Sequence, residues 1–419
     1  MNTTTAPAPT KDDTTWRIRA TSTQDWDEIH RVDELAFGYT WDPATGDTER
    51  GVLDLDRGLL AYDGDEPVGL TLSYQLRLSV PTGREVDTAG VTWVGVVPTH
   101  RRRGVLTELM RAQLADLHDR GEPVATLFAS EPGIYGRFGY GLASEQYALA
   151  IEHGRGGIQG PHDPGLRVRL MTVADARPAV EQVYASVRES RAGMPGRDEL
   201  WWARCTSDYP SERGKASALR VAVAEDAGRA RAYAIFTSTH VWESGSGQNE
   251  INVRESLATD AAAAAALWRM LLSTDLTRVV RVSVATDDVL LDLLTELRRA
   301  QPRLGDGLRG RLIDLPTALA SRTYDERWAG VVDIADRFAP WNQGRWRLSL
   351  EESGANCTRT EDPPDLAMDI ADLGGAYFGG RSLVRAAAAG RVMQGRPGAA
   401  AGLSRAMLHE PGPYCPFTF

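Results

Sequence analysis

The sequence has 419 residues, of which 42% are hydrophobic and 25% charged, and this composition excludes a fibrous or wholly disordered chain. With 57 acidic and 47 basic residues, the formal net charge is -10. This charge argues against sequence-independent binding to nucleic acid and suits cationic substrates. No apolar run reaches the roughly 18 residues of a membrane span. Three widely separated cysteines predict neither a disulfide framework nor a zinc site. Residues 1–14 lack the apolar core of a signal peptide, so we expect a disordered leader and a cytoplasmic protein.

The first unit, residues 15–160, is expected to form an α/β domain around a mixed sheet. It opens with an alternating strand, followed by Ser22 and Asp25 at the spacing of a capping box. Strand-like segments lie at 59–62, 67–77, 91–97 and 124–129, and a helix is predicted at 103–118. Strands that alternate with an amphipathic helix in this order are typical of an α/β unit.

Two further units follow the Gly- and Pro-rich stretch at 153–165. Residues 161–308 repeat the order of strand, capped helix and further strands, and resemble a degenerate second copy of the first unit. Residues 309–419 are expected to form a third unit of strands followed by Ala-rich helices. The last residues read CPFTF, which is unusual because chain termini are normally polar and frayed. We therefore expect this apolar end to have a role.

The stretch from Val91 to Gly141 carries the clearest chemical signal. A strand leads through Pro98 into Arg101-Arg102-Arg103-Gly104, which opens the predicted helix. A helix N-terminus offers unpaired N–H groups, arginines add donors for phosphate, and glycine lets a ligand approach the backbone. On these residues alone, a pyrophosphate site and a charged, solvated helix start are equally good interpretations.

The turn PTHRRRG at 98–104, together with ASEPGIYGRFGYG at 129–141, resembles the Eis (enhanced intracellular survival) family of GNAT N-acetyltransferases. The resemblance covers nearly all of the chain after the leader. It implies two tandem GNAT-like domains with mixed β-sheets, the second without a cofactor site, and a C-terminal α+β domain similar to sterol carrier proteins. It also implies acetyl-CoA as donor, small-molecule primary amines as acceptors, and commonly a homo-hexamer. The seven histidines show no metal-ligand spacing, so no metal is expected.

The resemblance also implies particular site residues. The family's CoA contacts fall on Val94, Gly95, Val96, Arg102, Arg103, Gly104, Val105, Leu106, Thr107, Ser130 and Glu131. Its catalytic tyrosine falls on Tyr135, and only the resemblance favours Tyr135 over Tyr140. Its catalytic carboxylate is the C-terminus, here Phe419.

These groups suit acetyl transfer to an amine. A free alkylamine, with a pKa of about 10.4, must lose a proton before it attacks a thioester. A terminal carboxylate has a pKa of about 3.3–3.7 in water, and a desolvated pocket raises that pKa and makes it a stronger base. A tyrosine with a pKa of about 10 can protonate a departing thiolate whose pKa is about 8.5. Strand N–H groups near Val96 are expected to polarise the carbonyl.

The acceptor pocket is expected to involve Phe37, Tyr39, Trp41 and Thr418, although the three aromatic residues fit an ordinary core equally well. Family members that acetylate aminoglycosides carry acidic pocket residues, one of them beside the terminal Phe. This chain has Thr418 there, and Tyr39 where another acid would align, so the sequence leaves aminoglycoside acceptors open.

Three hypotheses therefore stand. The first is an acetyl-CoA-dependent N-acetyltransferase acting on small-molecule amines. The second is a non-catalytic protein that holds acyl-CoA or a lipid as a sensor. The third keeps the enzyme but takes a protein lysine or a natural-product amine as acceptor. The G-x-G-x-x-G match at 305–310 leads into a strand rather than a helix, which is the wrong context for a dinucleotide site.

Overall fold

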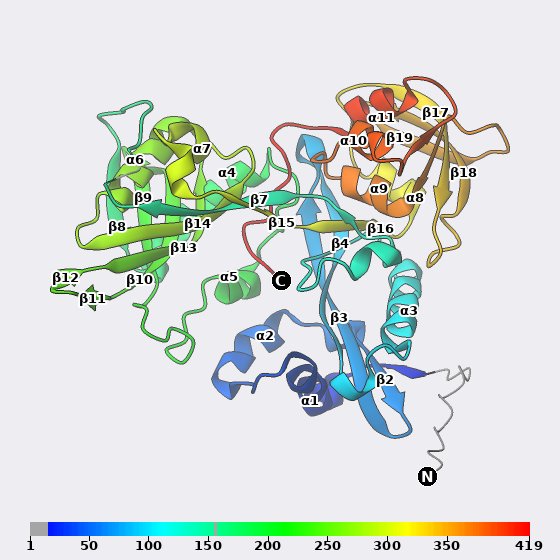
Figure 1. Ribbon diagram of the computed structural model, residues 1–419, viewed down its shortest axis with the longest axis horizontal. Coiled ribbons are helices and arrows are strands. Elements are labelled where there is room, and N and C mark those ends of the chain that lie inside the picture. Colours follow the sequence, from blue (N-terminus) through cyan, green and yellow to red (C-terminus); the bar gives the residue numbers. More distant parts are fainter. Residues whose placement is uncertain (1–15, 155–156) are drawn as a thin grey trace, which may run out of the picture.

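The computed structural model describes residues 16–154 and 157–419, and the expected leader at 1–14 lies outside this part of the chain. Two seven-stranded sheets and one five-stranded sheet dominate the fold, with helices packed on each of them (Figure 1). Each of the three sheets mixes parallel and antiparallel pairs. The predicted fold class, mixed α/β sheets in a tandem arrangement, is confirmed.

The first sheet has the strand order β1-β2-β3-β4-β5-β16-β6. Its strands are β1 (Arg17–Ala20), β2 (Leu59–Asp63), β3 (Glu66–Ser79), β4 (Glu85–Val96), β5 (Val124–Leu127), β16 (Arg309–Leu312) and β6 (Gly141–Leu142). Its helices are α1 (Trp26–Phe37), α2 (Gly46–Val52) and α3 (Val105–Asp119). A Cβ at Gly95 would meet Ala36 of α1, and one at Gly69 would meet Val105 of α3. Because Gly95 pairs with Leu70, the neighbour of Gly69, α1 and α3 cover opposite faces of the sheet.

Strands β4 and β5 lie side by side for only a short distance. Their parallel pairing joins Thr88–Gly90 to Val124–Thr126 and, within the described chain, extends no further. Beyond Gly90, β4 shifts register against β3, and Trp93 there has a positive φ of 51°. Such a bulge bends the strand, so the two strands separate toward their C-terminal ends. The backbone of β4 beyond Gly90 is therefore exposed on the side facing β5.

The second sheet has the order β15-β7-β14-β13-β10-β9-β8. Its strands are β15 (Arg303–Asp306), β7 (Glu145–Glu152), β14 (Thr277–Ala285), β13 (Asn249–Ala258), β10 (Arg229–Thr239), β9 (Arg220–Asp226) and β8 (Arg167–Met171). Helices α4 (Val173–Arg188), α5 (Glu199–Cys205), α6 (Ala261–Leu272) and α7 (Leu290–Leu293) accompany it, with a small hairpin of β11 (Trp242–Glu243) and β12 (Ser246–Gly247).

The second sheet repeats the central unit of the first without its basic turn. The parallel pair β13–β14, joined by α6, corresponds to the pair β4–β5 joined by α3. However, the N-cap of α6 is Asp260, whose carboxylate accepts the N–H of Ala263 and binds Arg231 at 2.9 Å. An acidic cap occupies the donors that an anionic ligand would need. The start of α6 therefore differs in charge from the start of α3.

The third sheet has the order β19-β18-β17-β20-β21. Its strands are β19 (Gly354–Arg359), β18 (Gly344–Glu351), β17 (Trp328–Ala335), β20 (Leu366–Asp369) and β21 (Met393–Gln394). Its helices are α8 (Leu315–Ala320), α9 (Ile370–Ala376), α10 (Leu383–Ala388) and α11 (Ala399–Met407). One continuous hydrophobic cluster runs from Trp16 of the first domain to Met407 of the third, so these two domains share a core.

Two expected domain boundaries differ from the structure. Strand β7 falls within the expected first domain (15–160) but pairs with β14 and β15 of the second sheet. Strand β16 falls within the expected third domain (309–419) rather than the second (161–308), yet it pairs with β5 and β6 of the first sheet. Strand patterns in a sequence identify elements but not their partners, and here β7 and β16 each pair on both sides with strands of a neighbouring domain's sheet.

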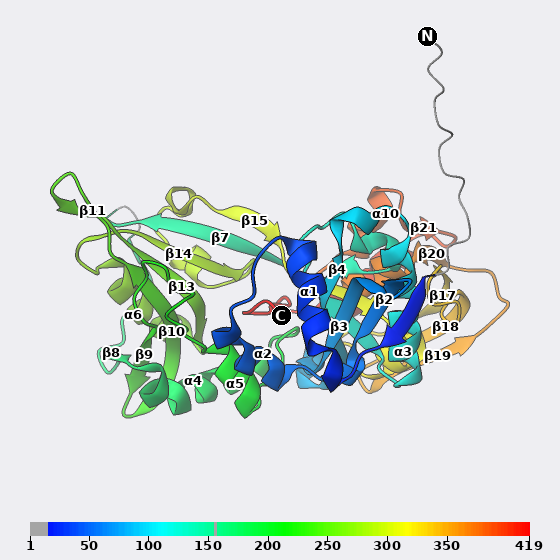
Figure 2. The same ribbon diagram turned by 90° about the horizontal axis from the view of Figure 1, so that it is seen from below.

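The last residues of the chain leave the third domain and run between the first two. The C-terminus lies near the centre of the molecule in both views. In Figure 1 it lies between α2 and the second sheet, and in Figure 2 between α1 and the second sheet. Tyr414 donates its N–H to Ala192 at 2.9 Å and its hydroxyl to Ser283 at 3.0 Å. Arg191 donates to the carbonyl of Gly412 at 2.7 Å. The second domain therefore holds the C-terminal segment in place.

Candidate active site

A cavity of about 750 Å³ opens where β4 and β5 separate. Its described lining is Ala36, Phe37, Val94, Gly95, Val96, His100, Arg101, Arg102, Gly104, Val105, Leu106, Thr107, Ser130, Glu131, Ile134, Tyr135 and Arg137. Ten of the eleven residues expected to contact CoA are in this list. The strand, the turn and the end of β5 thus meet around one space.

The turn before α3 has the conformation of an anion-binding loop. Arg102 and Gly104 have positive φ values of 62° and 90°, and α3 begins directly afterwards. At such a helix start the first N–H groups, here those of Val105 to Thr107, have no partner within the helix. The helix dipole adds partial positive charge at the same point. Together with the Arg102 guanidinium, these donors suit a pyrophosphate.

Arg103 is the expected contact whose side chain lies elsewhere. Its guanidinium stacks 5.0 Å from the ring of Trp16 and lies 3.5 Å from Asp63. Arg103 is absent from the described lining of the large cavity, and its expected contact with CoA stays a prediction. Arg101, which belongs to the predicted basic turn but not to the expected CoA contacts, lines the cavity and donates to the carbonyls of Ala36 at 2.7 Å and Val96 at 3.3 Å. It fastens the end of α1 to the end of β4.

A smaller cavity of about 310 Å³ adjoins the first. Its described lining is Asp33, Phe37, Tyr39, Trp41, Glu49, Val91, Thr92, Trp93, Val94, Phe128, Ser130, Tyr135, Thr418 and Phe419. Phe37, Val94, Ser130 and Tyr135 line both cavities. These four residues mark the junction at which a group held in one cavity would meet a group held in the other.

Tyr135 lies at this junction on a short helical turn, Tyr135–Phe138. Its side chain is buried, and burial together with the nearby charge of Glu131 raises the pKa of its hydroxyl above the usual value. The phenol therefore stays protonated at neutral pH. Within the described residues, its hydroxyl has no protein hydrogen-bond partner, so it is available to a ligand.

Tyr140, the competing tyrosine, occupies a different position. It is 1% exposed, its ring lies 6.1 Å from that of Tyr135, and it lines neither of the two joined cavities. Of the two tyrosines, Tyr135 is therefore the one that lies at the junction of the two cavities.

Two acidic side chains in the smaller cavity were missed by the sequence reasoning. Asp33 is buried, and its carboxylate accepts the hydroxyl of Tyr39 at 2.5 Å. Desolvation raises the pKa of Asp33, and burial with the adjacent carboxylate raises that of Tyr39. Glu49 of α2 also lines the cavity and binds Arg204 of the second domain. On the sequence both acids resemble ordinary helix-surface residues, and only the fold turns them inward.

The expected aromatic walls divide between cavity and core. Phe37 and Tyr39 are 50% and 42% exposed, which fits residues that face an open pocket. Trp41 lines the cavity as well, but it also packs 4.0 Å from the ring of His30 and 5.9 Å from that of Trp93. Trp93 and Phe128 complete the aromatic lining.

The last two residues of the chain close this cavity. Phe419 packs 5.3 Å from Phe128 and 6.4 Å from Tyr74, measured between ring centroids. A Cβ at Gly90 would lie 3.1 Å from the Phe419 ring, so the ring sits where β4 and β5 part. Thr418 is exposed and lines the same cavity. The apolar C-terminal end thus fits into the split between two strands of the first sheet.

A buried ion pair in the second domain supports this end. Arg197 binds Glu255 through both carboxylate oxygens, at 2.6 and 3.1 Å, and its guanidinium lies 5.3 Å from the ring of Phe417. Phe417 in turn packs 6.0 Å from Phe419, measured between ring centroids.

In the part of the chain that the structure covers, no group of three or more His, Cys, Asp or Glu residues is arranged to hold a metal ion. The helices in that part are also too short or too polar to span a bilayer.

This geometry defines a class of protein. A sheet split between parallel strands beside a basic turn, repeated in a second sheet without that turn, matches tandem acetyltransferase (GNAT) domains. Family models for GNAT domains match residues 17–143 and 193–312, and a sterol carrier protein domain model matches residues 315–416. GNAT acetyltransferases use acetyl-CoA, and the large cavity fits it: the basic turn suits the pyrophosphate and the exposed edge of β4 suits an amide-bearing arm.

Comparison with known proteins identifies the family of this chain. An uncharacterized N-acetyltransferase of Streptomyces avermitilis is 40% identical over 96% of this chain and 99% of its own length. The N-acetyltransferase Eis of Mycobacterium tuberculosis is 31% identical over 88% of this chain and 90% of its own length. The solved structure of Eis1 from Mycobacterium abscessus shares 31% identity, covers 96% of this chain and 100% of its own, and superposes with a TM-score of 0.80. The chain belongs to the Eis family of N-acetyltransferases.

Proposed function

We propose that this enzyme transfers the acetyl group of acetyl-CoA to a primary amine on a small molecule, with Tyr135 as the acid and the Phe419 α-carboxylate as the base. The observation that carries the proposal is the junction of the two cavities. Tyr135 lines both of them, and Phe419, the last residue of the sequence, lines the smaller one. A donor in the large cavity and an acceptor in the small one would meet beside these two groups.

Bound acetyl-CoA would supply the acetyl group as a reactive thioester. The turn from Arg101 to Gly104 and the start of α3 would hold its phosphates. N–H groups of β4 beyond Gly90 face the opening between the strands and would polarise the carbonyl that receives the amine. The protein thereby orients the donor before the acceptor arrives.

The acceptor amine must be neutral when it attacks. The α-carboxylate of Phe419, in a cavity walled by aromatic side chains, would accept the proton from the ammonium form directly or through one water. The amine nitrogen then forms a bond to the carbonyl carbon, and the bond from carbon to sulfur breaks as Tyr135 donates its phenolic proton to the departing thiolate. The nitrogen loses a second proton when it becomes the amide, and this proton restores the Tyr135 phenol. The first proton, held by the Phe419 carboxyl, is released to solvent.

The lining of the smaller cavity points to a class of acceptor. Asp33 and Glu49 would attract a cation, while Phe37, Trp93 and Phe128 offer an apolar surface. This combination favours an amine attached to an aromatic or aliphatic body over a uniformly polar sugar. Thr418 stands beside the terminal Phe where an acid would strengthen the binding of a polycation. Aminoglycosides are therefore proposed as weaker acceptors than arylalkylamines or polyamines.

Thiol release from acetyl-CoA tests the proposal. The untagged protein is mixed with acetyl-CoA and, in turn, with arylalkylamines, polyamines, aminoglycosides and lysine peptides. The proposal expects release with a small-molecule amine, fastest with arylalkylamines. Release only with lysine peptides would replace the small-molecule acceptor with a protein lysine. Bound acetyl-CoA without turnover across the panel would favour a sensor over an enzyme of this specificity. We also propose a homo-hexamer, which light scattering of the purified protein tests.

A further inference from the structure

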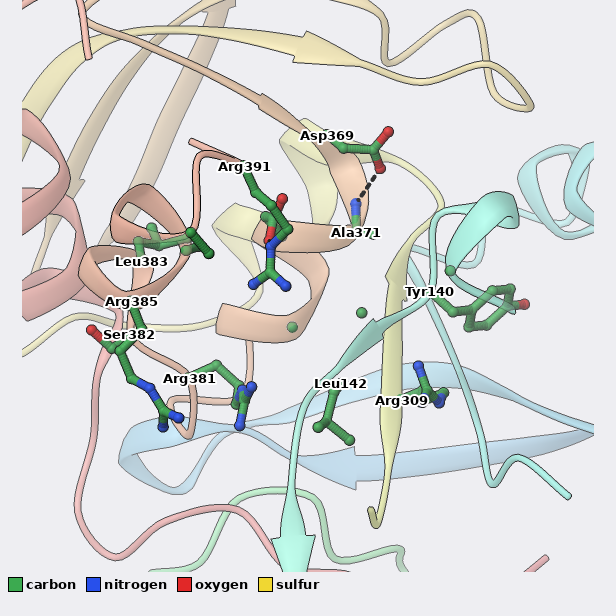
Figure 3. A pocket seen from close by; sticks show the side chains of 16 residues that line it. Tyr140, Leu142, Arg309, Asp369, Ala371, Arg381, Ser382, Leu383, Arg385 and Arg391 are labelled. Atoms are coloured by element: carbon green, nitrogen blue, oxygen red, sulfur yellow. Dashed lines mark hydrogen bonds and ion pairs between the residues drawn. The ribbon is translucent and has the colours of Figure 1, made fainter. Parts of the chain in front are cut away.

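A separate cavity of about 560 Å³ lies between the first sheet and the helices of the third domain (Figure 3). Its walls come from β6 and β16 on one side and from the region of α9 and α10 on the other. A Cβ at Gly141 would overlap the carbonyl of Ala371, so the two backbones touch at its edge. The cavity is therefore formed by a closely packed junction, and its volume is typical of small-molecule sites.

Four arginines line this cavity. Arg309 comes from β16, and Arg381, Arg385 and Arg391 come from the segment around α10, on the other side (Figure 3). The lining contains only two carboxylates, Asp369 and Asp372. The walls therefore carry more positive than negative charge.

Most of the donors on these arginines remain free. Arg381 uses one nitrogen on Glu145 at 2.5 Å, and this carboxylate lies outside the lining. Arg391 uses its Nε on Asp372 at 3.0 Å. Among the residues that the structure describes, the guanidinium of Arg385 has neither an ion pair nor a hydrogen bond. A guanidinium has five donors in a planar fork, so each of these side chains keeps donors for a ligand.

A buried donor on β16 points to the same chemistry. The Nε of Arg309 is buried and has no acceptor within the described chain, although its Nη2 reaches Asp306 at 3.2 Å. Buried donors in proteins are nearly always satisfied, so an unpaired one marks a position that suits a ligand oxygen. Phosphate and carboxylate groups match the fork of a guanidinium through paired hydrogen bonds.

We propose that this cavity binds a small molecule carrying two or more oxyanion groups, phosphate or carboxylate. Arg385 and Arg309 stand on opposite sides of the cavity and would bind separate groups of the ligand. Leu142 and Leu383 give the remaining wall an apolar surface that suits the carbon skeleton between those groups. This site is distinct from the large cavity, which is lined by a different set of arginines.

The loop that carries Tyr135 separates the two cavities. Tyr135 and Arg137 line the large cavity, whereas Gly136 and Tyr140 line this one. A ligand bound in this cavity would contact the loop at Gly136 and Tyr140, so we expect ligand binding to change the rate of acetyl transfer. This consequence rests on the proposed function, whereas binding itself does not.

Titration calorimetry with two probes, inorganic pyrophosphate and citrate, tests the site. The full chain is first saturated with CoA, so that the large cavity is filled. We expect one site per chain for at least one probe, and the probe that binds distinguishes phosphate from carboxylate as the ligand group. Arg385→Gln should weaken that binding by at least about tenfold, because a charge-assisted hydrogen bond is lost. Arg405→Gln is the matched control: Arg405 lies on α11, outside the cavity, and pairs with Glu326 at 3.1 Å.

Several results would overturn the proposal. Absence of binding by both probes would do so, as would equal affinity in wild type and Arg385→Gln. A change of oligomeric state in Arg385→Gln, with neither probe binding, would show that the arginines contact another subunit instead. An acetyl-transfer assay with each probe then separates the two levels. Binding without any effect on rate would refute the coupling to Tyr135 and leave the site itself intact.

Discussion

Tyr135 and Phe419 are separated by most of the chain, yet they line the same small cavity. Each has a structural reason for its place: Tyr135 starts a helical turn beyond β5, and Phe419 fills the gap left by Gly90. Neither residue is held by a side-chain hydrogen bond in the described chain. Packing therefore positions both groups, and their polar atoms are left for the substrates.

Replacing Tyr135 with Phe removes the proposed acid and keeps the ring. We expect kcat to fall by about 10²- to 10⁴-fold, the usual contribution of a general acid, with acetyl-CoA affinity unchanged. Tyr140→Phe is the matched control, since its buried hydroxyl has no partner among the described residues, and kcat should stay within about twofold of wild type. Steady-state kinetics and CoA titration measure both variants. Equal loss in the two variants would contradict the assignment of the acid.

Asp33 links acceptor affinity to pH. Its pKa is raised by burial, so its charge is lost at a higher pH than for an exposed aspartate. Above that pKa the carboxylate attracts a cationic amine, and as the pH falls through it the attraction disappears. We expect kcat/KM to fall on the acidic side in wild type, whereas Asp33→Asn should have a higher KM throughout and lack this part of the profile. A pH profile of the variant identical to that of wild type would rule out Asp33 as the titrating group.

At the scale of elements, the site depends on the separation of β4 from β5. In the described chain the two strands pair from Thr88 to Gly90 and no further, and the bulge at Trp93 bends the rest of β4 away from β5. The second sheet shows what the turn adds, because β13, α6 and β14 repeat the arrangement with Asp260 where the first sheet has Gly104. The two sheets therefore share the arrangement of strands and helix and differ at the start of the helix, where we propose the CoA site of the first sheet.

Gly90 tests how closely the C-terminal residue fits this split. A Cβ there would lie 2.6 Å from Leu76 and 3.1 Å from the Phe419 ring, so Gly90→Ala should push the ring out of place. We expect a loss of about 1–3 kcal/mol in the free energy of unfolding, and a drop in kcat with acetyl-CoA affinity retained. Gly305→Ala, in β15 with open space around it, should change neither quantity. Denaturant unfolding measures the free energy of unfolding of the two variants, and steady-state kinetics measures their kcat. Wild-type values of both quantities in Gly90→Ala would contradict the close fit of Phe419.

The elements show which parts of the site could be predicted. The basic turn and the tyrosine loop were recognisable because their residues are consecutive. Asp33 and Glu49 were missed because an acid on an amphipathic helix normally faces solvent, and only the packing of α1 and α2 turns them inward. Arg103 was expected at the CoA site from the family resemblance, whereas Arg101 and Arg102 are the arginines of the turn that line the cavity, because backbone direction decides which side chains face it. The pairing of β16 with the first sheet left no local signal at all.

At the scale of the whole molecule, three domains contribute to one site. The first supplies the split sheet, the third delivers the C-terminal segment, and the second anchors that segment through Arg191, Arg197 and Ser283. This division gives the second domain a function although it lacks the basic turn. It also explains why an apolar end of the chain is ordered: Phe417 and Phe419 are packed on both sides.

Arg197 tests the anchoring role. Arg197→Met would leave the Glu255 carboxylate buried without its cation, with only the Tyr233 hydroxyl as a partner in the described chain, so we expect a loss of about 3–5 kcal/mol in the free energy of unfolding. The double variant Arg197→Met with Glu255→Met should recover much of that stability, because no charge remains buried. Both should have lower kcat than wild type, since Phe417 loses the guanidinium beside its ring. Wild-type kcat in the stable double variant would show that the ion pair stabilises the domain without positioning the C-terminal segment.

The most direct test of the account concerns the C-terminal carboxylate itself. The measurement is the turnover of acetyl-CoA with the best amine of the panel, for the protein that ends at Phe419 and for one with a single glycine added after it. The added residue moves the carboxylate away and puts a neutral amide in its place, while leaving Phe419 in the chain. The account predicts that acetyl-CoA still binds with similar affinity and that kcat falls by about 10²-fold or more. Full activity in the extended protein would contradict the proposal that the α-carboxylate of Phe419 is the base.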